Sequence, residues 1–231
     1  MTERPKGLLL TRPKDQGRAM AERIRERAGA RWRSVLAPLL EIRHRPLRLE
    51  PPPDVTLVFT SVHGVQGYLA ATPVRDRPAL CVGMATAAAA RASGLSVTVG
   101  DGDADSLAAR ILAAPPNGPI WHLAGRHRAG DLDGALRAAG HVVEVIELYD
   151  QVARPLPRVV RAALGTGAIA GVVLMSPRTS ALFAAELEDV AVAPGCRAFC
   201  LSKAVAAPVA HLDLDLRIAG LPTQEALLAL L

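Results

Sequence analysis

The sequence predicts an α/β protein made of two similar doubly wound domains, each built on a parallel sheet. Short Val, Ile and Leu runs alternate with Ala-, Arg- and Glu-rich helical stretches along the chain. Several of these helical stretches end in glycine, as at Gly29, Gly94 and Gly140. In addition, parts of the sequence occur twice, which indicates two related domains.

The repeat consists of two pairs of matching segments. Val58–Val65 (VFTSVHGV) is echoed by Val173–Ser180 (VLMSPRTS), and Leu80–Ala88 (LCVGMATAA) by Phe199–Ala207 (FCLSKAVAA). Each segment is an apolar run that ends in Ser, Thr or Gly and leads into a helix-forming stretch. This pattern is typical of a buried parallel strand followed by a helix N-terminus. Two such domains facing each other are expected to form a cleft.

The predicted strands follow one another at short intervals. In chain order they are expected at 8–11, 32–37, 55–60, 79–82, 96–99, 120–124, 142–146, 172–175, 198–201 and 212–218. The first strand region, Leu8–Pro13, resembles Trp121–Arg126 and has no partner earlier in the chain. The N-terminal strand, helix and strand are therefore expected to join the C-terminal half of the chain in one sheet.

This reasoning predicts a discontinuous first domain. It comprises 1–37 plus 152–231, the second domain is inserted at 52–142, and both are of the flavodoxin-like type. The remaining segments, 38–51 and 143–151, are expected to be linkers. Both have an extended pattern and run in opposite directions, so we expect them to pair as a two-stranded hinge.

Composition limits the classes of protein that fit. Of the 231 residues, half are hydrophobic but only 3% are aromatic, so Val, Leu and Ala must fill the cores. The apolar runs fall short of the roughly 20 residues that cross a bilayer, and the start of the chain has no signal-peptide pattern. The three cysteines, Cys81, Cys196 and Cys200, are expected to be inert core thiols, with no metal site.

The net charge of +5 is compatible with nucleic acid, an anionic surface or an anionic small ligand. Many of the arginines lie between Arg18 and Arg33, where they surround one predicted helix with Glu22 and Glu26. Such a helix face is commonly only solvated. The aromatic side chains on which single-stranded nucleic acid stacks are few, which disfavours that partner.

Hydroxyl-bearing residues follow several predicted strands. Parallel α/β sheets bind ligands beyond the carboxyl ends of their strands, against helix N-termini that favour anions. Residues of this kind at the expected rim are Thr11, Ser61, Thr86, Ser176 and Ser202, with Gly64 and Gly83 beside them. Ser and Thr are also preferred N-caps, so each of them can serve its helix without any ligand.

Arginines reinforce the prediction of an anionic ligand. Arg12, Arg126 and Arg178 each lie just beyond a predicted strand end, with Arg128 and Lys203 also on the rim. The guanidinium group presents a planar fork of donors that matches carboxylate or phosphate. The Gly-rich fingerprints that hold nucleotide phosphates are missing, so we expect no cofactor.

A standard catalytic set is not recognisable. Ser61 and His63 are too close in sequence to form a nucleophile and its base, and no paired carboxylates follow strand ends. His122 is expected to lie within a strand rather than to bind a ligand. Tyr149 lies at the predicted crossing between domains, where its phenol could reach the cleft. Simple packing at the hinge is the alternative.

Short motifs run in order along almost the whole chain. They are Leu10–Pro13 (LTRP), Pro38–Ile42 (PLLEI), Phe59–Val65 (FTSVHGV), Val82–Gly83 with Thr86–Ala87, Tyr149, Ser176–Thr179 (SPRT), Ser202 with Val205–Ala206, and Pro222–Thr223. In order and spacing these motifs resemble the uroporphyrinogen-III synthase family. One departure is Gly64, which stands where Asn or Ala is common.

The resemblance implies a substrate and a reaction. The substrate would be hydroxymethylbilane, a linear tetrapyrrole with eight carboxylates. Loss of the ring A hydroxyl gives an azafulvene, which the substituted carbon of ring D attacks. A spiro intermediate then leads to closure with ring D inverted. The product, uroporphyrinogen III, feeds haem, sirohaem, cobalamin and chlorophyll biosynthesis, and this cyclising hydro-lyase needs no cofactor.

The resemblance also implies roles for individual residues. Tyr149 becomes the candidate acid that assists the departure of hydroxide, since a neutral phenol can donate a proton or hydrogen bond to a developing anion. The implied substrate-binding residues act largely through backbone N–H groups and arginine side chains. They are Thr11, Arg12, Ser61, Gly64, Gly83, Thr86, Arg126, Ser176, Arg178 and Ser202.

Two other classes of protein stay open at this point. A non-catalytic two-lobed binding protein for a small polyanion would share the geometry, although its usual location is extracytoplasmic. A basic nucleic-acid-binding module would bind DNA in a salt-dependent manner. We expect instead a cytoplasmic monomer that binds hydroxymethylbilane and makes at most transient contact with the preceding pathway enzyme. Neither nucleic acid nor a membrane is an expected partner.

Overall fold

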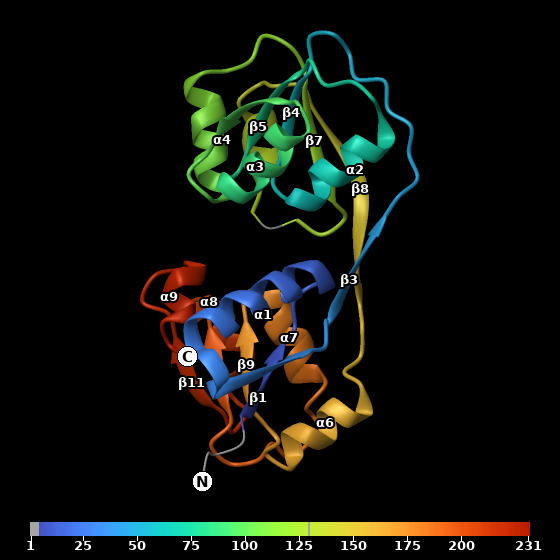
Figure 1. The fold of residues 1–231 in the computed structure, drawn as a ribbon. Coiled ribbons are helices and arrows are strands. Elements are labelled where there is room, and N and C mark those ends of the chain that lie inside the picture. The colour runs from blue at the N-terminus through green and yellow to red at the C-terminus, as the bar shows by residue number, and fades with distance from the viewer. Residues whose placement is uncertain (1–4, 129) are drawn as a thin grey trace. The chain divides into compact units, whose positions relative to one another are not determined.

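The computed structural model describes residues 5–128 and 130–231. The chain divides into two compact units: unit 1 is Met1–Glu41 with Val152–Leu231, and unit 2 is Ile42–Gln151. The segments expected to be linkers, 38–51 and 143–151, therefore fall largely within unit 2. Each unit is built around a largely parallel sheet with helices on both faces, which confirms the predicted fold class (Figure 1).

Unit 1 contains a sheet in which all neighbouring strands pair in parallel. In spatial order its strands are β11 (Asp215–Ile218), β10 (Arg197–Cys200), β9 (Ile169–Leu174), β1 (Lys6–Leu10) and β2 (Trp32–Leu36). Its helices are α1 (Lys14–Ala28), α6 (Arg158–Gly165), α7 (Pro177–Ala185), α8 (Lys203–Ala206) and α9 (Gln224–Leu228), with short 3-10 turns at η1 (Gly29–Arg31) and η2 (Ala207–Val209).

The consecutive leucines of β1 show why unit 1 is covered on both faces. Successive strand residues point to opposite sides of a sheet. Leu9 packs in the cluster that contains Val160 of α6 and Phe183 of α7, whereas Leu8 packs in the cluster that contains Met20 of α1. A strand buried on both faces needs a continuous apolar run, and each such leucine stabilises the fold by about 2 kcal/mol.

Unit 2 has the sheet order β3, β8, β7, β4, β5, β6. These strands are β3 (Leu40–His44), β8 (Val143–Ala153), β7 (Ile120–Gly125), β4 (Thr56–Phe59), β5 (Pro78–Cys81) and β6 (Ser96–Val99). Its helices are α2 (Val62–Ala71), α3 (Met84–Ala92), α4 (Ala104–Ala113) and α5 (Leu132–Ala138). From β8 to β6 the neighbouring strands pair in parallel.

The strands β3 and β8 carry the chain from one unit to the other. They are hydrogen-bonded neighbours. The N–H of Arg45 donates to the carbonyl of Leu148 at 2.8 Å, and the N–H of Arg154 donates to that of Leu39 at 2.9 Å. Partner numbers fall along one segment as they rise along the other, so the two run antiparallel.

The central strand of unit 2, β4, repeats the pattern of β1. Phe59 packs in the cluster that contains Tyr68 of α2 and Ala90 of α3. Val58, one residue earlier, packs in the cluster that contains Leu107 of α4 and Leu136 of α5. Even-numbered residues at this end of β4 therefore point their side chains toward α4 and α5.

Two strands differ most in length from the sequence-based expectation. β8 has 11 residues and continues well past the predicted end at residue 146, because it pairs with β7 and also neighbours β3. β11 has only four residues, whereas a strand was expected over 212–218. The apolar Leu212 and Leu214 pack against the core of unit 1 without pairing in the sheet.

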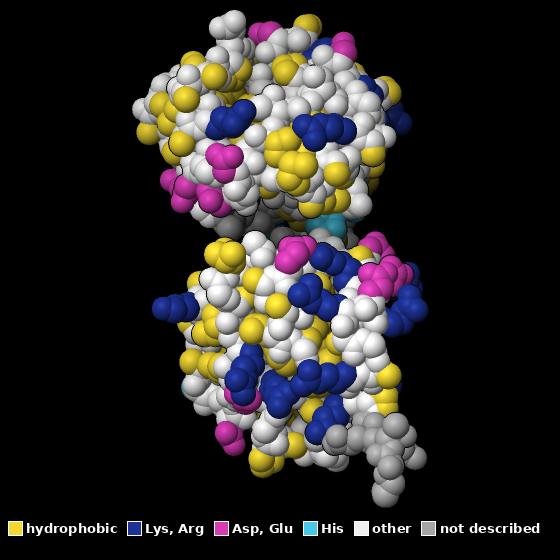
Figure 2. All heavy atoms as spheres, turned by 60° about the vertical axis from the view of Figure 1, so that its left-hand side comes forward, with side chains coloured by type: hydrophobic (Ala, Val, Ile, Leu, Met, Phe, Trp, Pro, Cys, Tyr) yellow, Lys and Arg dark blue, Asp and Glu magenta, His cyan; other side chains and the backbone are white. Residues whose placement is uncertain are grey.

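The cysteines and the charged surface follow the sequence analysis. Burial raises the pKa of Cys81, Cys196 and Cys200 to about 11 each, which leaves all three thiols unreactive near neutral pH. Figure 2 shows Lys and Arg side chains on the visible surfaces of the molecule, and several arginines of α1, such as Arg18 and Arg25, are exposed. Within the described residues, none of the helices combines the length and apolarity that a membrane crossing requires.

Candidate functional site

The carboxyl ends of parallel strands form one edge of each sheet, and helices begin there. We call these the unit 1 edge, which follows β1, β9 and β10, and the unit 2 edge, which follows β4, β5 and β7. At the unit 1 edge, Ser176 is the N-cap of α7 and Ser202 that of α8. At the unit 2 edge, Ser61 is the N-cap of α2 and Gly83 that of α3. First-turn backbone N–H groups favour anions at such positions.

The three serine hydroxyls act as helix caps. Each Oγ accepts a hydrogen bond from a first-turn backbone N–H: Ser61 from His63 at 3.2 Å, Ser176 from Thr179 at 3.2 Å, and Ser202 from Val205 at 3.4 Å. The side chains thus fix the direction in which each helix begins. A ligand at these positions would meet mainly backbone donors.

Thr11 and Arg12 follow β1 and behave differently. The Thr11 hydroxyl is buried and donates to the carbonyl of Val173 at 3.1 Å, so it ties β1 to β9 rather than facing a ligand. The Arg12 guanidinium donates to Gln16 Oε1 at 2.7 Å and lies 3.3 Å from Met175 Sδ. Burial lowers the pKa of Arg12, yet the group stays a cation at neutral pH.

Gly64 and Thr86 are buried parts of the fold. A Cβ on Gly64 would lie 2.3 Å from the carbonyl oxygen of Leu123, so glycine lets α2 approach β7. Thr86 is 5% exposed within α3. Gly83 differs, because its backbone is extended and a Cβ there would make only ordinary contact, 3.5 Å from Gly102 Cα. Of these three positions, Gly83 alone stands at the edge itself.

Tyr149 lies beside the end of β7. Its register partner is Gly125, where a Cβ would come within 2.5 Å of the tyrosine ring. The ring centroid of Tyr149 is 5.6 Å from that of His63 on α2 and 6.1 Å from that of His44 on β3. The side chain is 3% exposed. The centroids of the two histidine rings are 6.4 Å apart, so the three rings form one cluster.

Of the two remaining predicted arginines, Arg126 is exposed and Arg178 is partly buried. Arg126 follows β7; its backbone N–H donates to the carbonyl of Tyr149 at 3.0 Å, and its guanidinium lies 3.9 Å from Asp150. Arg178 lies in the first turn of α7, two residues after the N-cap Ser176. The structure thus brings Arg126 to Tyr149 at the unit 2 edge, and places Arg12, Ser176 and Arg178 at the unit 1 edge.

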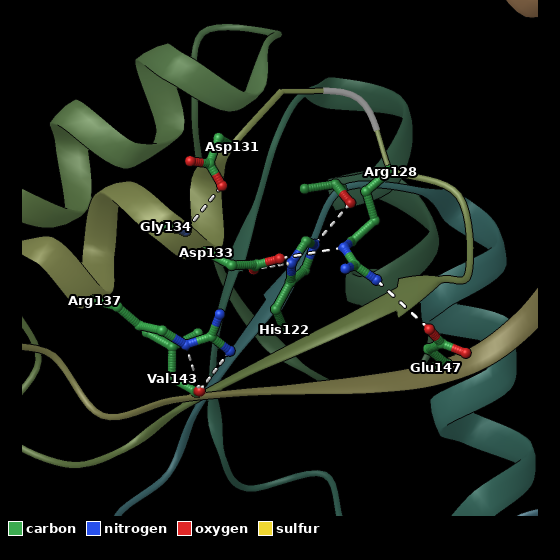
Figure 3. Close-up of polar contacts among 9 residues, drawn as sticks. His122, Arg128, Asp131, Asp133, Gly134, Arg137, Val143 and Glu147 are labelled. Atoms are coloured by element: carbon green, nitrogen blue, oxygen red, sulfur yellow. Dashed lines mark hydrogen bonds and ion pairs between the residues drawn. The ribbon is translucent and has the colours of Figure 1, made fainter.

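Sequence reasoning missed a polar network in unit 2 (Figure 3). Thr60 Oγ1 lies 3.0 Å from His122 Nε2, and His122 Nδ1 lies 2.5 Å from Asp133 Oδ1. Arg128 Nε is 3.2 Å from Asp133 Oδ2, and Arg128 Nη1 is 3.8 Å from Glu147 Oε1. His122 lies within β7, as expected. Its partner could not be found from sequence, because the contact depends on α5 packing against β7.

Asp133 is held in its ionised form. Burial by itself would raise the pKa of its carboxyl group. The hydrogen bond from His122 and the positive charges nearby, those of Arg128 and Arg137 among them, outweigh that effect and hold the pKa below its ordinary value. Asp133 is thus an acceptor-only group at neutral pH.

These features define a class of protein: paired parallel α/β units, one inserted in the sequence of the other, with helix N-termini and arginines at the strand ends. Such edges suit a small polyanion. Among the described residues, no three His, Cys, Asp or Glu side chains gather as a metal site. The groups at the two edges that suit such a ligand are backbone amides and guanidinium groups.

Comparison with protein families places the chain within this class. The family model for uroporphyrinogen-III synthase HemD matches residues 18–229. The chain belongs to the uroporphyrinogen-III synthase family, which confirms the resemblance seen in its motifs. A search of curated protein sequences found no match.

Solved structures show the same fold. The uroporphyrinogen-III synthetase of Helicobacter pylori is 17% identical and aligns with a TM-score of 0.68 over 97% of both chains. A mutant uroporphyrinogen III synthase of Thermus thermophilus, also 17% identical, aligns with a TM-score of 0.56 over 97% of this chain and 95% of the other. At this level of identity the likeness concerns the fold.

Proposed function

We propose that the protein is a cyclising hydro-lyase that converts hydroxymethylbilane into uroporphyrinogen III. The observation that carries this proposal is the family match over residues 18–229. The two edges support it independently, because both present donors suited to a ligand that carries many carboxylates. We further propose that it acts as a cytoplasmic monomer.

The carboxylates of the substrate are proposed to bind at the helix N-termini of both units. Those termini are capped by Ser61, Gly83, Ser176 and Ser202. Arg12, Arg126 and Arg178 would add guanidinium groups at the same edges. Because binding is shared among many donors, each one contributes modestly. The substrate's carboxylate side chains would be held while its reacting carbons remain free to approach one another.

Tyr149 is proposed to assist the departure of the ring A hydroxyl. The C–O bond breaks, the oxygen takes a proton from the phenol, and water leaves. We propose that His63 or His44, whose rings pack against Tyr149, returns a proton to it. The substituted carbon of ring D then attacks the azafulvene methylene, and the spiro intermediate rearranges to give the inverted ring.

Restraint of the substrate would supply much of the remaining catalysis. Unassisted closure joins ring A to the free position of ring D and gives the type I isomer. Holding the chain so that the substituted carbon lies against ring A favours the alternative closure, because the two reacting carbons are already positioned. The isomer formed therefore reports directly on the proposed function.

The test is to generate hydroxymethylbilane in the presence of the purified protein. After oxidation, the type I and type III uroporphyrins are separated by chromatography. Type III product above the level of a heat-denatured control is the expected result. If only type I forms, the protein is not a synthase, and a two-domain polyanion-binding protein becomes the better description.

A further inference from the structure

The network of Thr60, His122 and Asp133 connects the interior of unit 2 to its edge. His122 and Asp133 are 2% and 8% exposed, respectively. Thr60 is partly exposed and directly follows β4, one residue before the N-cap of α2. The hydroxyl at the edge is therefore bonded to a buried imidazole, which is bonded in turn to a buried carboxylate.

Hydrogen-bond polarity along this network follows from Asp133. An ionised carboxylate only accepts hydrogen bonds, so the Nδ1 of His122, 2.5 Å from Asp133 Oδ1, must carry a proton. In a neutral imidazole the other nitrogen is then an acceptor. The Nε2 of His122 is 3.0 Å from Thr60 Oγ1, so Thr60 must donate its O–H to it.

We take the buried ring of His122 as neutral, with its one proton on Nδ1 toward Asp133. Arg128 lies 3.2 Å from the second oxygen of Asp133 and 3.8 Å from Glu147 Oε1, so both oxygens of Asp133 have partners.

The consequence appears at the edge. With its O–H committed to His122, the Thr60 oxygen has only lone pairs left to offer a ligand. A carboxylate cannot hydrogen-bond to such an oxygen, because both groups are acceptors. The helix N-termini and Arg126 at this edge, by contrast, present backbone N–H donors and a guanidinium group suited to carboxylates. Thr60 therefore matches a different part of a tetrapyrrole, its pyrrole N–H.

We propose that Thr60 accepts a hydrogen bond from a pyrrole N–H of the substrate, and that His122 and Asp133 are positioning residues that fix this polarity. The inference rests on the proposed function. Loss of the ring A hydroxyl places positive charge on the pyrrole ring, so its N–H becomes a stronger donor. A hydrogen bond that strengthens as this charge develops lowers the barrier to reaction.

The primary test compares Thr60→Val with Thr60→Ser. Valine keeps the shape and removes the acceptor, so kcat/KM for type III formation should fall about tenfold to a hundredfold. Serine keeps the hydroxyl and should retain activity within about threefold. Equal activities of Thr60→Val and the wild type would overturn the role of Thr60.

The second test is a double-mutant cycle with Asp133→Asn. An asparagine N–H would donate to Nδ1, moving the histidine proton to Nε2 and reversing the bond to Thr60. Asp133→Asn alone should lower kcat about as much as Thr60→Val. In the Thr60→Val background it should have no further effect beyond about twofold, because it acts through Thr60. Losses that multiply would show a separate structural role and refute the positioning role.

Asp131→Asn is the matched control. Asp131 is the N-cap of α5 and accepts from the N–H of Gly134, a function that asparagine also performs. This change lies in the same segment as Asp133, so it should leave both kcat and KM within about twofold of the wild-type values. A loss as large as that of Asp133→Asn would attribute the effect to the segment and count against the proposal.

A measurement without substrate separates this inference from the proposed function. Nitrogen-15 shifts of His122 identify which ring nitrogen carries the proton. The wild type should show protonation at Nδ1 alone, and Asp133→Asn should shift it to Nε2. A wild-type imidazolium protonated at both nitrogens would overturn the inference even if type III product forms. Absence of type III product with the expected tautomer would refute the proposed function instead.

Discussion

The two edges of this protein share a framework but differ in chemistry. Ser176 and Ser61 occupy the same place in the repeated segments, and both cap a helix after a central strand. The unit 1 edge offers the Arg12 guanidinium beside capped helices. The unit 2 edge adds Tyr149, clustered with two histidines, and the Thr60 network. The repeat thus supplies capped helix N-termini twice, whereas the tyrosine–histidine cluster and the Thr60 network lie in unit 2.

One pair of matched core positions carries an apolar side chain in unit 1 and a polar one in unit 2. Leu9 of β1 corresponds to His122 of β7 in the repeat, and both side chains are buried. Leu9 is surrounded by apolar residues of α6 and α7. A histidine at this depth is tolerated only with hydrogen-bond partners, which Thr60 and Asp133 provide. At this position unit 2 therefore has a hydrogen-bonded histidine that reaches Thr60 at the edge, whereas unit 1 has a leucine packed among apolar side chains.

The largest effect is expected at Tyr149. Tyr149→Phe keeps the ring packed against His63 and His44 and removes the hydroxyl, so kcat should fall by about a hundredfold or more. The midpoint of thermal unfolding should stay close to that of the wild type. Steady-state assay of type III product measures the effect. A variant with wild-type turnover would remove Tyr149 from the chemistry while leaving the family assignment intact.

Gly64 tests the packing of unit 2. Gly64→Ala would force a Cβ to within 2.3 Å of the Leu123 carbonyl, so the free energy of unfolding should fall by about 1–3 kcal/mol. The corresponding residue of unit 1, Thr179, already carries a larger side chain. Gly83→Ala is the control, with an expected change within about 0.5 kcal/mol. Equal stabilities of the two variants in chemical denaturation would show that α2 can shift away from β7.

The lowered pKa of Asp133 predicts that the stability of the protein depends on pH in the acidic range. Its pKa is lowered in the folded state, so its stabilisation is complete above the ordinary value of 3.8 and is lost as pH falls through the lower, folded value. The stability difference between the wild type and Asp133→Asn should therefore shrink as pH falls below about 4. The total loss should be about 1.4 kcal/mol for each unit by which folding lowers the pKa of Asp133. Urea denaturation across pH measures it. A constant difference would contradict the lowered pKa.

The serine caps should respond alike in the two units. Ser61→Ala and Ser176→Ala each remove an acceptor for one backbone N–H, so each should cost about 1 kcal/mol of stability. Activity should fall less than tenfold, since the backbone donors remain. Denaturation and steady-state kinetics on both variants provide the comparison. A hundredfold loss of activity in either variant would place that hydroxyl in the reaction itself.

The smallest effect is expected at the thiols. Cys81 and Cys200 occupy matching buried strand positions in the two units, and the pKa of each is raised to about 11. Neither should react with a thiol reagent such as dithiobis-nitrobenzoate in the native protein, whereas both should react after unfolding. Rapid native labelling of either residue would indicate that its unit opens locally.

Much of the fold could be predicted because local patterns carry it. The apolar run Leu8–Leu10 predicted a strand buried on both faces. The repeat predicted that this strand joins the sheet formed by the C-terminal half of the chain. Expected N-caps such as Ser61, Ser176 and Ser202 begin helices in the structure. The length of β8 was less predictable, because it depends on pairing with β7 and on its neighbour β3.

The sequence by itself determined the alternation of strands and helices, the family, and the residue types at the strand ends, because each of these depends on short-range pattern. Only the tertiary structure decided what those residues face. It showed that Thr11 bonds to β9, that Gly64 permits close packing, and that His122 joins Thr60 and Asp133. Such contacts join separate elements across a sheet or between a helix and a strand, and no local pattern records which side chains meet there.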